Sequence, residues 1–180
     1  MPSMNQGLPI HMQRQYTLVL DLDETLVHFD QRKRNYRARP HAQRFLSEMS
    51  KYYELVIFTA GLKEYADWIL DDLDRLKCIR FRLYRNSCKF RRGVYVKDLA
   101  RIGRDLTRTI IVDNIADNFD LQPDNGIHIL SWFNNAQDTE LLKLEPVLKA
   151  IVENNVMDVR DMIKQYFRPQ ASRGLVIGSP

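Results

Sequence analysis

Residues 18–26 read Leu18-Val19-Leu20-Asp21-Leu22-Asp23-Glu24-Thr25-Leu26, an apolar run that delivers two carboxylates where a strand should end. Side chains at positions i and i+2 of an extended segment lie on the same side, so Asp21 and Asp23 can serve one site. In an open α/β sheet, ligands bind at the carboxyl ends of the strands. Two adjacent carboxylates repel each other, which favours a metal between them or a proton on one. Taken alone, such a pair is more often an acidic surface turn.

Polar residues follow three further strand-like runs in the same way. Thr59 follows the run 55–58, Lys97 follows the run 94–96, and Asp113-Asn114 follow the run 110–112. Each has a simpler structural interpretation by itself: a helix N-cap for Thr59, a solvated surface lysine for Lys97 and a turn for Asp113-Asn114. Because all of them occur in order at strand ends, we interpret them as parts of one site.

This order of a carboxylate pair, a hydroxyl, an ammonium and a carboxylate-amide pair resembles the haloacid dehalogenase (HAD) superfamily. The motifs Asp-Leu-Asp-Glu-Thr-Leu-Val (21–27), Val-Lys-Asp-Leu (96–99), Arg-Asp-Leu (104–106) and Ser-Trp-Phe (131–133) are similar to its FCP/SCP branch, also called the NIF domain. That branch includes phosphatases of the RNA polymerase II C-terminal domain (CTD), Dullard-type phosphatases and the mitochondrial presequence-receptor subunit. The resemblance predicts a phosphatase domain over residues 16–167, with a flexible leader at 1–15 and a flexible tail at 168–180.

Length and composition predict one globular domain. The chain has 180 residues, of which 44% are hydrophobic and 28% charged, with a net charge of +4. No stretch is long and apolar enough to predict a membrane span, and no signal peptide is apparent. Cys78 and Cys88 lack disulfide or zinc spacing, which is typical of a reducing compartment. We therefore expect an intracellular protein, in the nucleus or cytoplasm first, with the mitochondrion as a remaining alternative.

Hydrophobic periodicity predicts helices beginning near Pro40, over 62–77, from about 138 and over 159–166. A hairpin should turn at Gly93, and Pro146 should kink or split the helix in which it lies. Strands that alternate with helices predict a mostly parallel central sheet with helices on both faces, a Rossmann-like α/β fold that agrees with the resemblance. Trp68 and Trp132 are assigned to the core.

The resemblance implies a Mg²⁺-dependent phosphoserine/phosphothreonine protein phosphatase that acts through an aspartyl-phosphate intermediate. Asp21 is then the nucleophile and Asp23 the general acid and base. Thr59 and Lys97 are expected to hold the phosphoryl oxygens. The implied magnesium ligands are Asp21, Asp23, Asp113 and Asn114. The substrate-binding residues are expected to be Thr25, Tyr65 and Arg85.

The chain departs from the small CTD phosphatases between His28 and Pro40. These relatives carry an inserted β-hairpin segment there, whereas here only residues 29–39 remain, so the resemblance implies a capless and open site. This favours a phosphorylated protein or peptide as substrate. Whether peptides like the RNA polymerase II tail are among the substrates stays open. The basic residues of this region could attract acidic or multiply phosphorylated partners, or form only a solvated loop. The basic residues of the 32–44 stretch, which ends just beyond this region, are Arg32, Lys33, Arg34, Arg37, Arg39 and Arg44.

Two other functions remain as alternatives. The presequence-receptor subunit shares the fold and also has a short insert, so a protein-binding module with little or no phosphatase activity is the first alternative. Its relatives can lack the catalytic carboxylates, but Asp21 and Asp23 are present here. Nucleic-acid binding through the arginine clusters is a weaker hypothesis, because no recognised nucleic-acid motif supports it. The sequence does not indicate an oligomeric state.

Overall fold

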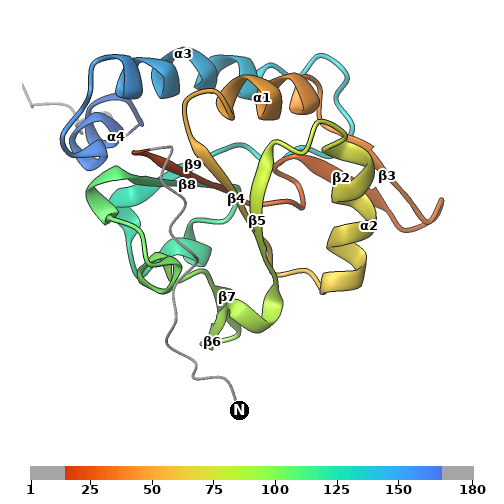
Figure 1. The fold of residues 1–180 in the computed structure, drawn as a ribbon. Helices are drawn as coiled ribbons and strands as arrows, with labels where there is room; N and C mark the ends of the chain where they lie inside the picture. The colour runs from red at the N-terminus through yellow and green to blue at the C-terminus, as the bar shows by residue number, and fades with distance from the viewer. Residues whose placement is uncertain (1–14, 168–180) are drawn as a thin grey trace, which may run out of the picture.

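The computed structural model describes residues 15–167, so the predicted tail and all of the predicted leader except Gln15 lie outside the described residues. At its centre is a five-stranded sheet whose paired strands are all parallel, in the order β5-β4-β1-β8-β9 (Figure 1). These strands are β1 (Thr17–Leu20), β4 (Glu54–Phe58), β5 (Ile79–Leu83), β8 (Thr109–Asp113) and β9 (Gly126–His128). The predicted Rossmann-like α/β fold is confirmed.

Strand β1 lies between β4 and β8. Its last residue, Leu20, is opposite Ile57 of β4 and Val112 of β8, so the three strands end close to the same level. All residues of these strands are buried, which explains why they read as continuous apolar runs and do not alternate. The segments that follow them therefore begin side by side at one edge of the sheet.

The connections place all the α-helices on one face of the sheet. The chain steps from β1 to β4 and from β4 to β5 in the same direction, and right-handed crossovers then put both intervening helices on the same side. The opposite face is covered by short 3₁₀ helices, and Figure 1 shows the hairpin at residues 89–96 across the sheet from the helices at 42–49 and 140–153.

The helices that share the larger core are α1 (Ala42–Met49), α2 (Lys63–Leu73), α3 (Glu140–Glu153) and α4 (Val159–Phe167). The 3₁₀ helices are η1 (Arg85–Ser87), η2 (Leu99–Ile102), η3 (Leu106–Arg108), η4 (Ala116–Phe119) and η5 (Pro123–Asn125). No helix within residues 15–167 combines the length and the apolar character needed to cross a bilayer.

The predicted hairpin forms β6 (Lys89–Arg91) and β7 (Val94–Val96), and its turn contains Gly93 as expected. Arg92 and Gly93 both have positive φ, 49° and 83°, which is the backbone of a type I′ turn. The second strand of this hairpin leads directly to Lys97.

Two helix predictions need correction. Pro146 does not split α3, which continues unbroken for 14 residues. Proline removes one backbone hydrogen bond, but Leu144, Leu148 and Ile151 are buried in the core and hold the helix in place. The helix predicted over 62–77 ends at Leu73, because the Asp74 carboxylate accepts the backbone N–H groups of residues 78 and 79 and turns the chain toward β5.

The core prediction is confirmed for Trp132 and wrong for Trp68. Trp132 is 4% exposed, whereas Trp68 is 48% exposed. The Trp68 ring packs edge-on against Phe29 and Tyr36, with ring centroids 6.4 and 5.6 Å apart. Both partners belong to a second antiparallel hairpin, β2 (Val27–Asp30) and β3 (Asn35–Ala38). Trp68 lies at a helically spaced apolar position because its ring packs against this hairpin, and not because it packs against the sheet.

The basic stretch at 32–44 does not form one surface. Arg39 is 1% exposed; its guanidinium contacts Asp138 at 2.7 and 2.8 Å and donates to the backbone oxygens of Thr25 and Leu130. Arg44 forms an ion pair with Glu145 at 3.1 Å. The exposed basic residues that remain belong to the β2–β3 hairpin: Arg32, Lys33, Arg34 and Arg37.

Candidate active site

A pocket of about 490 Å³ lies where the segments after β1, β4 and β8 meet. The predicted site residues that line it are Asp21, Asp23, Tyr65, Arg85 and Asn114. Four others are fully buried and do not line it: Thr25, Thr59, Lys97 and Asp113. Segments distant in the sequence thus converge at the edge of the sheet that the strand-end pattern predicts.

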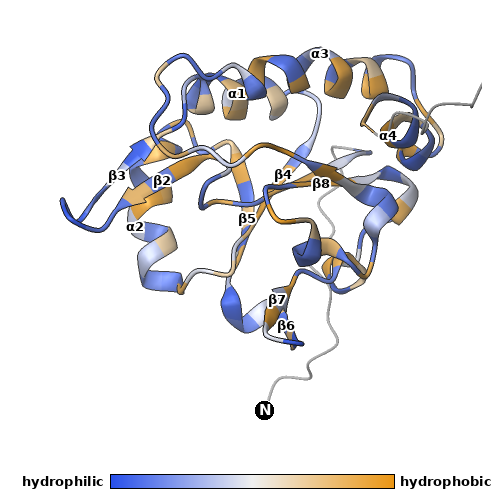
Figure 2. Ribbon diagram, turned by 180° about the vertical axis from the view of Figure 1, so that it is seen from behind, coloured by the Kyte–Doolittle hydropathy of each residue, from blue (hydrophilic) through white to orange (hydrophobic). Residues whose placement is uncertain are grey.

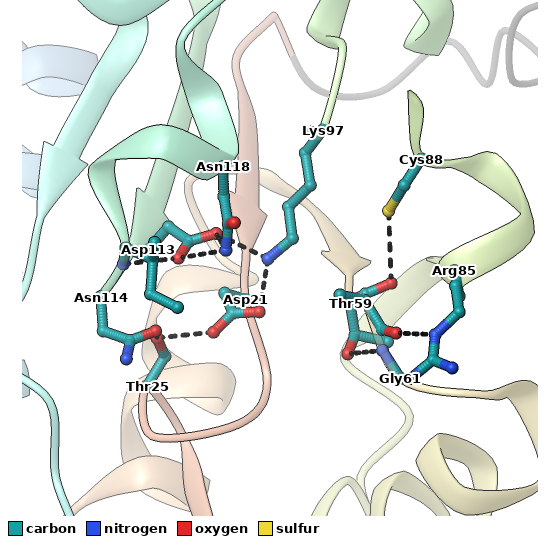
Figure 3. A network of polar contacts seen from close by, with 12 residues as sticks. Asp21, Thr25, Thr59, Gly61, Arg85, Cys88, Lys97, Asp113, Asn114 and Asn118 are labelled. Atoms are coloured by element: carbon teal, nitrogen blue, oxygen red, sulfur yellow. Dashed lines mark hydrogen bonds and ion pairs between the residues drawn. The ribbon is translucent and has the colours of Figure 1, made fainter. Parts of the chain in front are cut away.

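Lys97 lies between two carboxylates. Its Nζ donates to Asp21 Oδ1 and, at 2.6 Å, to Asp113 Oδ2 (Figure 3). Its side chain is 0% exposed, so the alternative of a solvated surface lysine is wrong. Burial opposes the positive charge, yet Asp21 and Asp113 raise the pKa of Lys97 above its ordinary value. This buried ammonium fixes one oxygen of Asp21 and leaves the other for different contacts.

Asp113 is held on both oxygens by protein donors. The Ile115 N–H donates to its Oδ1 at 2.9 Å, and the Asn118 amide donates to Oδ1 at 3.1 Å and to Oδ2 at 3.3 Å. Burial raises the pKa of the Asp113 carboxyl, the nearby Asp21 raises it further, and Lys97 acts in the opposite direction. Asp113 therefore supports Lys97 from behind and is separated from the pocket.

Asp23 is in a different environment from Asp21. The Tyr65 hydroxyl donates to Asp23 Oδ1, and both residues line the pocket. Burial raises the pKa of Asp23; the Tyr65 hydrogen bond lowers it in part, and the charge of Asp21 raises it again. A carboxyl with a raised pKa holds a proton more readily near neutral pH, which is what a general acid requires.

Thr25 joins Asp21 to Asn114. Its hydroxyl donates to Asp21 Oδ2 at 2.9 Å and lies 3.4 Å from Asn114 Oδ1 (Figure 3). Asn114 Nδ2 donates to Ser131 Oγ. The Ser131 contact turns the amide oxygen of Asn114 toward Asp21. Asp21 Oδ2 and Asn114 Oδ1, two oxygen atoms that can bind a metal, thus lie close together. Mg²⁺ prefers oxygen ligands and retains several waters. The donor set fits magnesium, although no three Asp, Glu, His or Cys side chains converge as metal ligands within residues 15–167.

Thr59 supports Gly61, which lines the pocket. Its hydroxyl accepts the Gly61 N–H at 2.9 Å, so it does not cap α2, whose N-cap is Leu62. A Cβ at position 61 would lie 3.1 Å from Thr59 Oγ1 and 3.2 Å from the Tyr65 ring, which explains a glycine at this close approach. Arg85 Nε donates to the Ala60 oxygen at 2.6 Å, and the residue lies exposed at the mouth of the pocket.

The sequence reasoning missed several residues of this site. Asn118 lines the pocket, donates to Asp113, and accepts the Lys97 N–H on its backbone oxygen at 2.6 Å. Its signal is weak, because it is one of several Asn and Asp residues between 113 and 125. Phe29 and Gln31 also line the pocket from the β2–β3 hairpin, which the short segment between His28 and Pro40 largely forms.

Comparison with known proteins identifies the family. A family model described as "NLI interacting factor-like phosphatase" matches residues 16–160. The chain belongs to this family.

Two relatives show how far the likeness extends. The human "Carboxy-terminal domain RNA polymerase II polypeptide A small phosphatase 1" is 41% identical over 166 residues, which is 82% of this chain and 63% of the relative. "CTD small phosphatase-like protein 3" of Caenorhabditis elegans is 46% identical over 173 residues, covering 86% and 60%. This chain thus spans about three fifths of the length of these two relatives.

A solved structure supports the fold. The structure titled "The Structure of Fcp1, an essential RNA polymerase II CTD phosphatase" has a TM-score of 0.66 and 18% identity, and it covers 84% of this chain and 66% of that one. At this identity the likeness concerns the arrangement of strands and helices alone.

Proposed function

We propose that this chain is a Mg²⁺-dependent phosphoserine/phosphothreonine protein phosphatase in which Asp21 is the nucleophile. One observation carries the proposal. Asp21 directly follows the central strand β1 with one oxygen bound to buried Lys97, and Asp23, a carboxyl with a raised pKa, shares its pocket. A nucleophile held in place and a separate proton donor are what phosphoryl transfer through a covalent intermediate needs.

In the first step, Asp21 attacks the phosphorus and an aspartyl-phosphate forms as the ester oxygen leaves. Asp23 donates its proton to that oxygen, so a neutral serine or threonine hydroxyl departs. In the second step, Asp23 accepts a proton from a water that attacks the phosphorus. The Asp21 carboxylate and inorganic phosphate are then released. Tyr65 holds Asp23 through both steps, and Lys97 fixes the orientation of Asp21.

We further propose that Asp21, Asn114 and the backbone carbonyl of Asp23 hold the magnesium ion. When bound, the ion would neutralise charge on the phosphoryl oxygens, which otherwise repels an attacking carboxylate. Asp113 would not bind the ion directly, because protein donors already occupy both of its oxygens; it orients Lys97 instead. Thr25 holds the Asp21 oxygen that faces Asn114.

The substrate we propose is a phosphorylated protein segment, including peptides like the RNA polymerase II tail. The relatives' names refer to that tail, and the pocket extends from Asp21 and Asp23 to Gln31 of the β2–β3 hairpin. Arg85, exposed at the mouth, would contact the phosphorylated segment. A location in the nucleus or cytoplasm follows from the same substrate and belongs to the proposal.

The test is hydrolysis of an aryl phosphate and of a phosphoserine peptide, with Mg²⁺ or with EDTA. We expect magnesium-dependent turnover that Asp21→Asn abolishes. Asp161→Asn is the matched control, because it makes the same chemical change on an exposed residue of α4, remote from the pocket. If the folded wild-type protein turns over neither substrate with Mg²⁺, the phosphatase proposal fails and a protein-binding module becomes the better hypothesis.

A further inference from the structure

The β2–β3 hairpin carries an exposed basic tip, formed by Arg32, Lys33, Arg34 and Arg37. No ion pair to any of these four is recorded within residues 15–167, whereas the buried Arg39 nearby is fully paired. The hairpin projects from the body of the protein, and its tip is hydrophilic (Figure 2). The tip therefore presents cations that the fold itself does not use.

The tip has a defined shape. Asp30 Oδ1 accepts the backbone N–H groups of Arg32 at 3.0 Å and of Lys33 at 3.2 Å, which closes the turn locally. The Asp30 carboxylate thus accepts hydrogen bonds from the backbone of the turn, and its charge also interacts with Lys33 and Arg37. Residues 30–37 contain four cationic side chains and one carboxylate, so the tip is strongly positive.

Aromatic packing fastens the hairpin beside the pocket. Phe29 packs edge-on against Tyr65 with centroids 5.5 Å apart, and Tyr36 packs against Trp68 and donates its hydroxyl to Asp72 at 2.5 Å. Tyr65 in turn donates to Asp23. The hairpin is therefore connected by direct contacts to the pair of carboxylates proposed to act on the phosphate.

The pocket reaches from those carboxylates to the base of the tip. Asp21 and Gln31 line the same pocket, and Gln31 is the residue before Arg32. A sphere of about 490 Å³ would be about 10 Å in diameter, a distance that an extended peptide covers in about three residues. A peptide with its phosphate at Asp21 thus brings a residue a few positions away beside the basic tip.

We propose that the β2–β3 tip is a specificity site for substrates that carry acidic or additional phosphorylated residues a few positions from the scissile phosphate. This rests on the proposed phosphatase function and adds to it a substrate class. Phosphate and carboxylate groups are the partners that unpaired arginine and lysine side chains bind, and neutral or basic flanking residues would gain nothing there.

The experiment measures binding, so that it does not depend on turnover. The full chain carrying Asp21→Asn is titrated into fluorescent phosphoserine peptides, and affinity is read by anisotropy. Three peptides differ only in the residues two to five positions on either side: glutamine, glutamate or a second phosphoserine. We expect the acidic and doubly phosphorylated peptides to bind about fivefold more tightly than the neutral one. This is the change in affinity expected from about two exposed ion pairs. Raising the salt concentration should remove most of this difference.

Matched variants locate the effect. Arg32→Ser with Lys33→Ser should bring the ratio between acidic and neutral peptides below about two. Arg80→Ser with Lys164→Ser removes the same total charge from exposed residues of β5 and α4 that do not line the pocket, and it should keep the ratio. Thermal unfolding checks that both double variants fold.

Equal affinity of the protein for all three peptides, or an equal loss of the affinity ratio in both double variants, overturns the proposal. Single-stranded RNA that binds more tightly than the acidic peptide and depends on Arg32 and Lys33 also overturns it.

The two proposals fail in different ways. Absence of turnover by the wild-type protein contradicts the phosphatase but leaves the anisotropy ratio standing as recognition of acidic phosphopeptides. Turnover of the aryl phosphate together with equal peptide affinities preserves the enzyme and removes the specificity site.

Discussion

At the scale of single residues, the same side-chain type has very different roles according to what surrounds it. Lys97 and Lys149 both bind two carboxylates. The Lys97 side chain is 0% exposed, and that of Lys149 is 23% exposed. Water can replace the ammonium of Lys149 but not that of Lys97. Removal of the charge should therefore cost much more at Lys97.

The variant Lys97→Met leaves Asp21 and Asp113 buried without their shared cation. We expect the free energy of unfolding to fall by about 3–5 kcal/mol, the cost typical of breaking a buried ion pair. Lys149→Met, the matched control, should cost about 1 kcal/mol or less. Urea denaturation at pH 7 measures both. A Lys97→Met protein as stable as the Lys149→Met protein would show that the buried ammonium is not needed as a counter-charge.

Sequence reasoning reaches the residues of the site by their position after apolar strands. Asp21, Asp23 and Asn114 are placed at the pocket by the paired ends of β1 and β8, which local hydrophobicity predicts well. Asn118 was missed because it acts through a contact with Asp113 that no periodic pattern marks. Thr59 follows its strand as expected; its hydroxyl accepts the Gly61 N–H, and its contact with a transferred phosphate stays a prediction.

At the scale of elements, the β2–β3 hairpin depends on α2. Its two strands form a small sheet of their own, and its aromatic rings pack on the helix against Trp68 and Tyr65. An isolated two-stranded hairpin is marginally stable in water, so the aromatic contacts decide whether this one is ordered. This explains why an exposed tryptophan belongs to the structure without belonging to the core.

Trp68→Ala should loosen the hairpin and leave the central sheet intact. Two edge-on ring contacts are worth about 1–3 kcal/mol together, so the β2 and β3 amides should exchange with solvent about 5- to 150-fold faster. Amides of β1 and β8 should keep their protection. Hydrogen exchange read by mass spectrometry or NMR tests this, with Leu76→Ala, an exposed residue after α2, as control. Unchanged protection of β2 and β3 would contradict the anchoring role of Trp68.

At the scale of the whole molecule, carboxylates bridge elements and make stability depend on pH. Partial burial acts to raise the pKa of Asp67, but hydrogen bonds from Lys63, Tyr84 and Arg82 lower it to about 2. The pKa values of Asp98 and Asp138 are also lowered, against the effect of burial, by hydrogen bonds that include those from Lys89 and Arg39 respectively. These three carboxylates connect the edge of the sheet, the β6–β7 hairpin and the start of α3 to their neighbours.

The sign of the effect follows from these shifts. The folded-state pKa of each group lies below its unfolded value of about 3.9, so the folded protein binds fewer protons than the unfolded chain between them. Their contribution is therefore fully present above about pH 5 and is lost as the pH falls from about 4 toward 2. Urea denaturation at a series of pH values should show this loss, and Asp67→Asn should make it shallower. An unchanged pH dependence in Asp67→Asn would contradict the assignment.

Motifs and hydrophobic patterning along the chain are enough to predict the parallel sheet, the order of its functional strand ends and the family, because buried parallel strands are continuous apolar runs and their polar ends follow directly along the chain. The burial of Lys97 and Arg39, the exposure of Trp68 and the folding of residues 27–38 against α2 beside the pocket could not be predicted in this way. Each of these depends on contacts between residues far apart in the chain. Burial and charge pairing arise from such contacts, whereas local periodicity records only which side of an element is apolar.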